Sequence, residues 1–288
     1  MNSTTLTINT PQKMLWALHS SSLSSEPNAA FVKEWYEQVH LPSTTPEQNF
    51  ELWSTHDRQR LTLYQIGATH TLITKHAAYY QNRLQVNTNV LQRLRSDWRP
   101  EKLGSWVEIH PEGVNTGWYL PGLISFNQLC QVLEKSVFKQ KIIHRWANMF
   151  VHSTCIGYGE SWSTTFIRQV DLMANATQSI SSQYHKALHL CELLEVPTFP
   201  SFLLEIFQTH EVHQLGVSLW MTDESVLKFG LRVFKPSIKL LMALCLLASF
   251  TDEDEDFLAQ IHSMSARVQW VEVQQTTDGL KTEVSYQL

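Results

Sequence analysis

Tryptophans and glutamates that recur together are the residues of this sequence best suited to chemistry. Three Trp and Glu pairs have a spacing of two residues, which places both side chains on one face of a strand: Glu51 with Trp53, Trp106 with Glu108, and Trp270 with Glu272. A fourth alternating run contains Trp220. The pattern indicates a polar cavity walled by aromatic rings. The alternative is that these tryptophans pack beneath helices, because Trp is common in strands.

Basic residues share the polar faces of the same runs. Lys228 and Arg232 alternate with Leu, Phe and Val residues over 226–233. Arg60 and Tyr64 lie in the first run, and Lys281 lies in the last. Inside a closed sheet such groups are suited to binding an anion. The alternative is a solvated sheet face for Lys228 and Arg232, and an exposed turn for Arg60.

Five predicted β-hairpins separated by helical segments must position these side chains. Alternation of period two on both sides of a turn marks the hairpins, which span 49–67, 104–122, 151–170, 215–234 and 268–288. Helical spacing of apolar residues marks 71–94, 126–150, 172–207 and 237–262, and Pro197 and Pro200 split the third segment. We therefore predict an α+β fold in which ten strands close into a barrel with helices outside. The third hairpin alternates too weakly to be oriented.

Composition limits the class of protein and its partners. The 288 residues are 43% hydrophobic and carry a net charge of −5 with 22 Lys and Arg, which argues against a nucleic-acid surface. The longest apolar run, Leu240 to Leu247, is shorter than the roughly 20 residues that span a membrane. Four scattered cysteines without a CxxC pair indicate a reduced, cytoplasmic protein. We expect a flexible N-terminal arm over 1–27, with a short helix near 14–19, and a single domain over 28–288.

Two motifs that resemble metal sites are incomplete. Asp252–Asp256 (DEDED) lacks the DDxxD spacing and suits the acidic first turn of a helix. His185 and His189 are four residues apart, but Lys186 stands where the HExxH motif has its glutamate. We therefore expect no metal ligands from protein side chains.

The run GVSLWMTDESVLKFGLRV (216–233) resembles a hairpin of the ABBA prenyltransferases. Within that group the chain is most similar to the cyanobactin prenyltransferases, which prenylate ribosomal peptides. The shared positions are Glu224, Ser225, Leu227, Lys228, Leu231 and Arg232. The family often has a polar residue where Gly230 stands. Its members fold as five ααββ repeats that form a ten-stranded antiparallel barrel surrounded by helices, in agreement with the repeats found here.

The resemblance implies a reaction and a role for each candidate residue. A dimethylallyl or geranyl group would move from its diphosphate to a peptide or aromatic acceptor, with Mg²⁺ bound through the diphosphate. Glu51 holds the place of the family's base. The diphosphate would be held by Arg60, Lys228, Arg232, Lys281 and Tyr64. The prenyl and acceptor pocket would be lined by Trp53, Trp106, Glu108, Trp220, Trp270 and Glu272.

Two other functions fit the same sequence. The enzyme could prenylate free indoles or phenols, because the sequence does not define the acceptor. A non-catalytic barrel that binds a ligand or a partner is the alternative from a different class of protein, since fold alone does not assign chemistry.

Overall fold

The computed structural model describes residues 9–39, 49–55, 58–85, 102–124, 145, 154–161, 167–247, 259, 267–276 and 279–288. Ten strands form five hairpins, each of two consecutive strands. The strands are β1 (Asn49–Thr55), β2 (Leu61–Ala68), β3 (Lys102–His110), β4 (Gly113–Ile124), β5 (Thr154–Ser161), β6 (Arg168–Met173), β7 (Gly216–Met221), β8 (Val226–Phe234), β9 (Arg267–Thr276) and β10 (Gly279–Gln287). All five predicted hairpins are present.

The ten strands close into one antiparallel barrel. Each strand pairs with its neighbours in sequence, and β1 pairs with β10 to close the sheet. Trp53 lies opposite Ser285 across that closing pair. Closure leaves no free sheet edge and creates an interior with one face of every strand turned toward it. The predicted fold class is confirmed.

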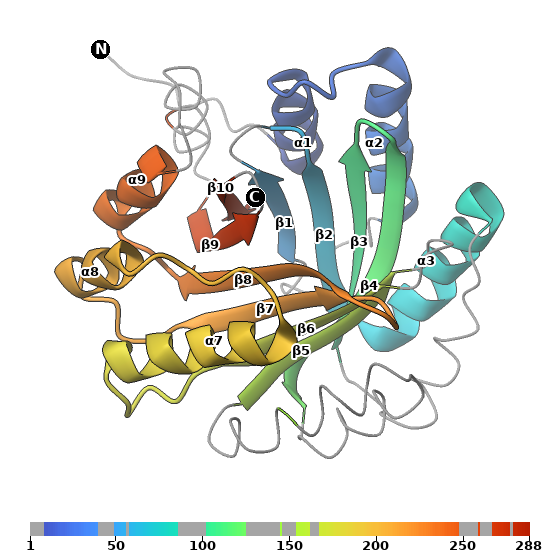
Figure 1. Cartoon of the computed structure of the whole chain (residues 1–288). Coiled ribbons are helices and arrows are strands. Elements are labelled where there is room, and N and C mark those ends of the chain that lie inside the picture. The colour runs from blue at the N-terminus through green and yellow to red at the C-terminus, as the bar shows by residue number, and fades with distance from the viewer. Residues whose placement is uncertain are drawn as a thin grey trace, which may run out of the picture.

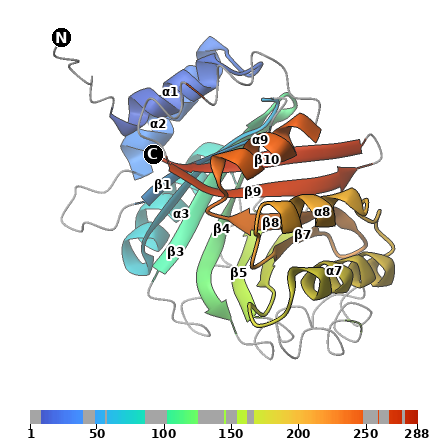
Figure 2. The same ribbon diagram turned by 90° about the vertical axis from the view of Figure 1, so that its left-hand side faces the viewer.

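Six helices within the described residues lie on the outside of the barrel (Figures 1 and 2). They are α1 (Thr10–His19), α2 (Glu26–Val39), α3 (Thr69–Leu84), α7 (Ile180–Leu194), α8 (Phe202–Thr209) and α9 (Ile238–Leu247). Helix α3 contacts β2 and β3, α7 contacts β8, and α9 contacts β10. None of the described helices has the length and apolar character needed to cross a bilayer.

Several helix boundaries differ from the sequence-based expectation. Leu172 belongs to strand β6, and the helix of that segment begins at Ile180. The Pro197 and Pro200 break lies between α7 and α8, as expected. The predicted helix 126–150, apart from Arg145, and the DEDED motif lie outside the described residues.

The N-terminal segment is more ordered than the expected flexible arm. Helix α1 begins with a capping box in which Asn9 and Gln12 bond to each other's backbone N–H groups. Met14 and Leu18 on this helix are fully buried in the main hydrophobic core. The described residues 9–27 therefore pack as part of the folded chain, which corrects the expectation of a loose arm there.

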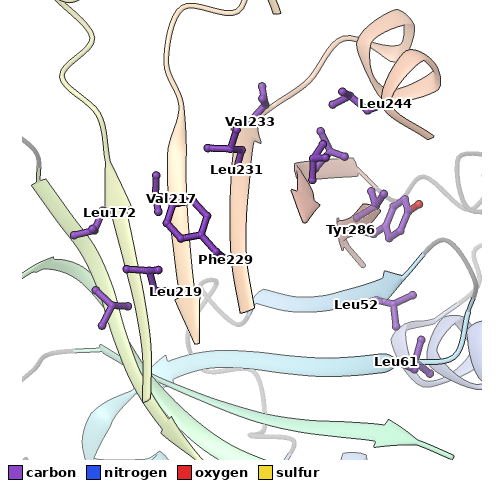
Figure 3. Close-up of a cluster of buried hydrophobic side chains, with 14 of the residues drawn as sticks. Leu52, Leu61, Leu172, Val217, Leu219, Phe229, Leu231, Val233, Leu244 and Tyr286 are labelled. Atoms are coloured by element: carbon purple, nitrogen blue, oxygen red, sulfur yellow. The ribbon is translucent and has the colours of Figure 1, made fainter. Parts of the chain in front are cut away.

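The hydrophobic core lies between the outer face of the barrel and the helices. Leu219, Leu231 and Leu244 are among its fully buried members (Figure 3). Burial of one such side chain contributes about 1.5–3 kcal/mol. Because this core takes the apolar face of each strand, the polar alternate residues are left to the barrel interior.

Candidate functional site

The strand register turns the predicted Trp and Glu pairs into the barrel. Residues directly opposite in an antiparallel pair share a face, and Tyr64 lies opposite both Glu51 and Trp106. Glu272 lies opposite Arg232 on one side and Glu283 on the other. The alternation prediction is confirmed for these strands.

An aromatic cluster fills the middle of the interior. Its buried members are Trp53, Tyr64, Trp106 and Trp270. The ring centroids of Trp53 and Tyr64 are 5.3 Å apart in a stacked arrangement, and those of Trp53 and Trp270 are 5.1 Å apart. Trp220 packs at the border of the cluster, 5.8 Å from Trp106. Such rings attract cations through their π faces and exclude water.

Lys228 and Arg232 lie inside the barrel beside this cluster. The Arg232 guanidinium carbon is 4.0 Å from the Trp270 ring centroid, and the Lys228 ammonium is 5.2 Å from that of Trp220. Both cations contact Glu272: Lys228 Nζ at 2.9 Å from Oε1, and Arg232 Nη2 at 2.7 Å from Oε2. Arg232 is buried, Lys228 is half-buried, and both are paired with a carboxylate, so neither lies on an open, solvated sheet face.

Other carboxylates complete this charged network. Glu283 Oε2 accepts from Lys228 Nζ at 2.5 Å, and Asp171 Oδ2 accepts from Arg232 Nη1 at 3.1 Å. Tyr119 also donates to Asp171 Oδ2, at 2.6 Å. Three acidic residues therefore surround two basic ones.

The network shifts the acid–base behaviour of its members. Burial alone would raise the pKa of Glu272, but Lys228 and Arg232 outweigh it and hold that pKa below its usual value. Burial would lower the pKa of Lys228, yet Glu272 and Glu283 raise it. Both residues therefore remain charged near neutral pH.

Tyrosine hydroxyls in the interior stay protonated. Burial, together with the Asp171 carboxylate, raises the pKa of Tyr119 well above its usual value. Burial and the Glu51 carboxylate do the same for Tyr64. Among the described residues the buried Tyr64 hydroxyl has no hydrogen-bond partner, so it can donate to a ligand.

Glu51 has a defined place on the wall next to the aromatic cluster. One of its oxygens, Oε2, accepts from Trp53 Nε1 at 3.0 Å and from Ser285 Oγ at 3.1 Å. These bonds orient the carboxylate and leave Oε1 available for a further hydrogen bond. Glu108 is further around the wall on β3, where Oε1 accepts from Asn115 at 3.4 Å.

A pocket of about 340 Å³ opens at the barrel end where the β1–β2, β3–β4 and β9–β10 hairpins turn. Arg60, His110 and Lys281 contribute to its rim, and Lys228 and Glu283 lie at its inner side. We call this the mouth pocket. Arg60 and Lys281 therefore lie with Lys228 at one opening, whereas Arg232, Tyr64 and Glu51 are not among the residues that line it.

Sequence reasoning missed Tyr119, Asp171 and Glu283. Asp171 alternates with the apolar Val170 and Leu172, and Tyr119 lies between Trp118 and Leu120. Alternation gives the inward direction of such residues, but none of the three belongs to the Trp and Glu pairs or to the basic positions that indicated the site. The third hairpin is now oriented, because Asp171 on β6 points inward to Arg232.

No group of three or more His, Cys, Asp or Glu suited to a metal ion is found in the described part of the chain. The His185 and His189 pair lies on the exposed side of α7, where His189 Nδ1 is 3.3 Å from Glu192 Oε2. Three carboxylates of the barrel interior, those of Asp171, Glu272 and Glu283, are engaged with Lys228 and Arg232 instead.

Comparison with known proteins supports the fold through structure and not through sequence. No protein-family sequence profile matches the chain, and no curated protein is significantly similar to it in sequence. The prenyltransferase PriB in its apo form superimposes with a TM-score of 0.71 at 10% identity, over 96% of this chain and 94% of that one.

Two further solved structures have a fold similar to that of this chain. The 5-dimethylallyl tryptophan synthase of Streptomyces coelicolor, in complex with DMASPP and Trp, has a TM-score of 0.69 at 10% identity over 96% of this chain and 93% of that one. AnaPT from Neosartorya fischeri has a TM-score of 0.61 at 10% identity over 99% and 94% of the two chains. The chain therefore has the closed, ten-stranded barrel fold of the ABBA prenyltransferases.

Proposed function

We propose that this chain is a prenyltransferase that moves an allylic prenyl group from its diphosphate to an aromatic acceptor. The observation that carries the proposal is the placement of Lys228 and Arg232 inside a closed barrel, directly against tryptophan rings. Cations there can hold a departing diphosphate while the rings shield the allylic cation from water. The similarly folded S. coelicolor enzyme is a 5-dimethylallyl tryptophan synthase, which supports this chemistry.

The mouth pocket is the proposed entrance for the donor. Arg60, Lys228 and Lys281 line it, and two acidic residues, Glu112 and Glu283, lie among them. Basic residues thus outnumber acidic ones there, although the whole chain is acidic. Magnesium would enter as the counter-ion of the diphosphate and assist the departure of the leaving group.

The proposed reaction breaks the bond between the allylic carbon and the diphosphate oxygen. The electron pair of that bond leaves with the diphosphate, whose charge Lys228 and Arg232 stabilise. The acceptor then forms a bond to the allylic carbon, and the proton that it loses goes to Glu51. Tyr64 lies beside Glu51, and its hydroxyl, which has no partner in the described part of the chain, would donate a hydrogen bond to the diphosphate.

A peptide is the finer proposal for the acceptor. Leu227 at the mouth pocket has 54% of its surface exposed, so an apolar side chain is available outside the barrel. A peptide longer than one amino acid could contact this residue, whereas free tryptophan within the barrel would not reach it. The resemblance of 216–233 to the cyanobactin enzymes points to the same class of acceptor. The buried thiols of Cys191 and Cys245 suit a cytoplasmic enzyme.

The test is incubation with dimethylallyl or geranyl diphosphate, with and without Mg²⁺, and with either free tryptophan or a panel of Trp- and Tyr-containing peptides. Mass spectrometry should show addition of one prenyl group. Isopentenyl diphosphate is the matched control donor, since it is not allylic and cannot form the stabilised cation. Absence of any prenylated product with all acceptors would contradict the proposal.

The neutralised state of Lys228 and Arg232 favours one second candidate, a barrel that binds a ligand without catalysis. Each cation already has a carboxylate partner within 3.1 Å. A binding protein would take up the prenyl diphosphate or an aromatic ligand and release it unchanged. The same incubation distinguishes the two, because the ligand would then be recovered intact.

A further inference from the structure

We propose that Glu283 is an internal counter-ion that a prenyl diphosphate must displace from Lys228, and that this displacement takes up one proton from solvent. The inference rests on the proposed function and concerns the same site. It makes Glu283 a positioning residue, which acts on the diphosphate through Lys228 and not by direct contact with the reacting atoms.

The geometry places Glu283 beside Lys228 at the inner side of the mouth pocket. Its side chain lines the pocket and is 4% exposed, while its Oε2 atom is 2.5 Å from Lys228 Nζ. Gln274 Nε2 donates to the same oxygen at 3.4 Å and to Glu272 Oε1 at 3.1 Å. An anion that enters from the pocket must therefore compete with the Glu283 carboxylate for the Lys228 ammonium.

On the interior side of Glu283, acidic groups outnumber basic ones. Lys228 from β8 and Glu272 from β9 contact or face Glu283 directly, and Glu108 from β3 repels it through the interior. Thr55, opposite on β1, carries no charge. The pocket side adds four further titratable groups, which are Arg60, His110, Glu112 and Lys281.

Glu272 and Glu283 lie opposite each other and share one lysine. Only Glu272 has a second cation, Arg232. Burial raises the pKa of Glu283; Lys228 opposes that rise and the Glu272 charge adds to it, so the pKa lies above its usual value. Glu283 is thus the member of the pair that takes a proton more readily.

A bound diphosphate makes protonation of Glu283 more favourable still. If the diphosphate takes over Lys228, an ionised Glu283 would be left buried, unpaired and beside a second anion, which is strongly unfavourable. Protonation at a Glu283 oxygen removes that charge, and the new hydroxyl can donate a hydrogen bond to the diphosphate. By linkage, binding that takes up one proton weakens about tenfold for each pH unit of increase.

The experiment measures binding and not turnover. Dimethylallyl thiolodiphosphate is titrated into the full chain by calorimetry between pH 7 and 9, where a phosphate with a second pKa of about 6 is already ionised. Each pH is repeated in two buffers of different ionisation enthalpy, which gives the number of protons taken up. We expect about one proton per ligand and an affinity that falls as the pH rises.

Glu283→Gln removes the charge and keeps the shape, so it should bind the thiolodiphosphate more tightly at pH 8 and lose the proton uptake. Glu112→Gln is the matched control, because Glu112 lines the same pocket but is not among the ion-pair partners of Lys228. It should keep the proton uptake. Binding by the unaltered chain without proton uptake, or an unchanged uptake in Glu283→Gln, overturns the inference alone. Absence of binding at every pH overturns the proposed function and the inference together.

Discussion

Gly230 lies directly beneath the carboxylate of Glu272. A Cβ atom at position 230 would be 2.4 Å from Glu272 Oε1, closer than real Cβ contacts allow. Because position 230 of β8 carries no side chain, the Glu272 carboxylate can occupy the space between Lys228 and Arg232. The charged network of this chain therefore depends on a glycine at this position.

Gly230→Ala should displace Glu272 and weaken its ion pairs. We expect a loss of roughly 1–3 kcal/mol in the free energy of unfolding, the range for an overpacked interior. Urea denaturation followed by Trp fluorescence measures it. Gly104→Ala is the matched control, because its Cβ would overlap the uncharged Tyr64 side chain at 2.1 Å from the hydroxyl and meets no member of the ion pairs. An equal loss in both variants would contradict the special role of Gly230.

Arg232→Met should be far more damaging than removal of a rim cation. Within the described residues it leaves Asp171 without an ion-pair partner and Glu272 with Lys228 alone, and both carboxylates are buried. Loss of one member of a buried pair costs about 3–5 kcal/mol. Arg60→Met at the exposed mouth should change the unfolding free energy by no more than about 0.5 kcal/mol. Similar denaturation midpoints for the two variants would show that the buried network contributes little to folding.

Glu51→Gln should slow prenyl transfer while leaving diphosphate binding nearly intact. The amide can still accept from Trp53 and Ser285, so the shape is kept and only the basicity is lost. General-base catalysis contributes about 10²–10⁴-fold, and a decrease in kcat of that size is expected. Glu108→Gln and Glu272→Gln are to be compared in the same assay. Full turnover in Glu51→Gln together with its loss in one of the others would move the role to that residue.

Tyr80→Phe should destabilise the fold without altering ligand affinity. The Tyr80 hydroxyl accepts from Trp35 Nε1 at 2.8 Å and lies 2.6 Å from Ser105 Oγ, on the outer side of the barrel. Its removal leaves buried polar atoms of both partners unsatisfied, at a cost of about 1–3 kcal/mol. Thermal unfolding and thiolodiphosphate titration measure the two properties separately. A weakened affinity at full stability would contradict a purely structural role.

Most of the barrel could be predicted from alternation within single strands. Side chains of a strand point alternately to its two faces, so Lys228 and Arg232 had to share one face and Phe229 and Leu231 the other. The same local rule turned Glu51 inward. It worked wherever a strand had a clearly apolar face, because the helices outside cover that face.

The third hairpin shows where this rule gives no signal. Gly157 and Gly159 on β5 have no side chain that could mark a face. The Tyr119 ring of the neighbouring strand β4 occupies the space above Gly157, because a Cβ atom on Gly157 would collide with the Tyr119 hydroxyl. Contact with this neighbouring strand therefore orients β5.

Residues 9–27 are a related case. Their Ser-rich composition suggested a loose arm, but Met14 and Leu18 are buried against other elements.

The partners of each charge were decided only by the tertiary structure. Lys228 and Glu283 are 55 residues apart, and Arg232 and Asp171 are 61 apart. The sequence by itself determined which residues face the interior, because the direction of a side chain is a local property of the strand. Barrel closure determined which of them meet, because contact across the interior depends on the register of every strand pair between them.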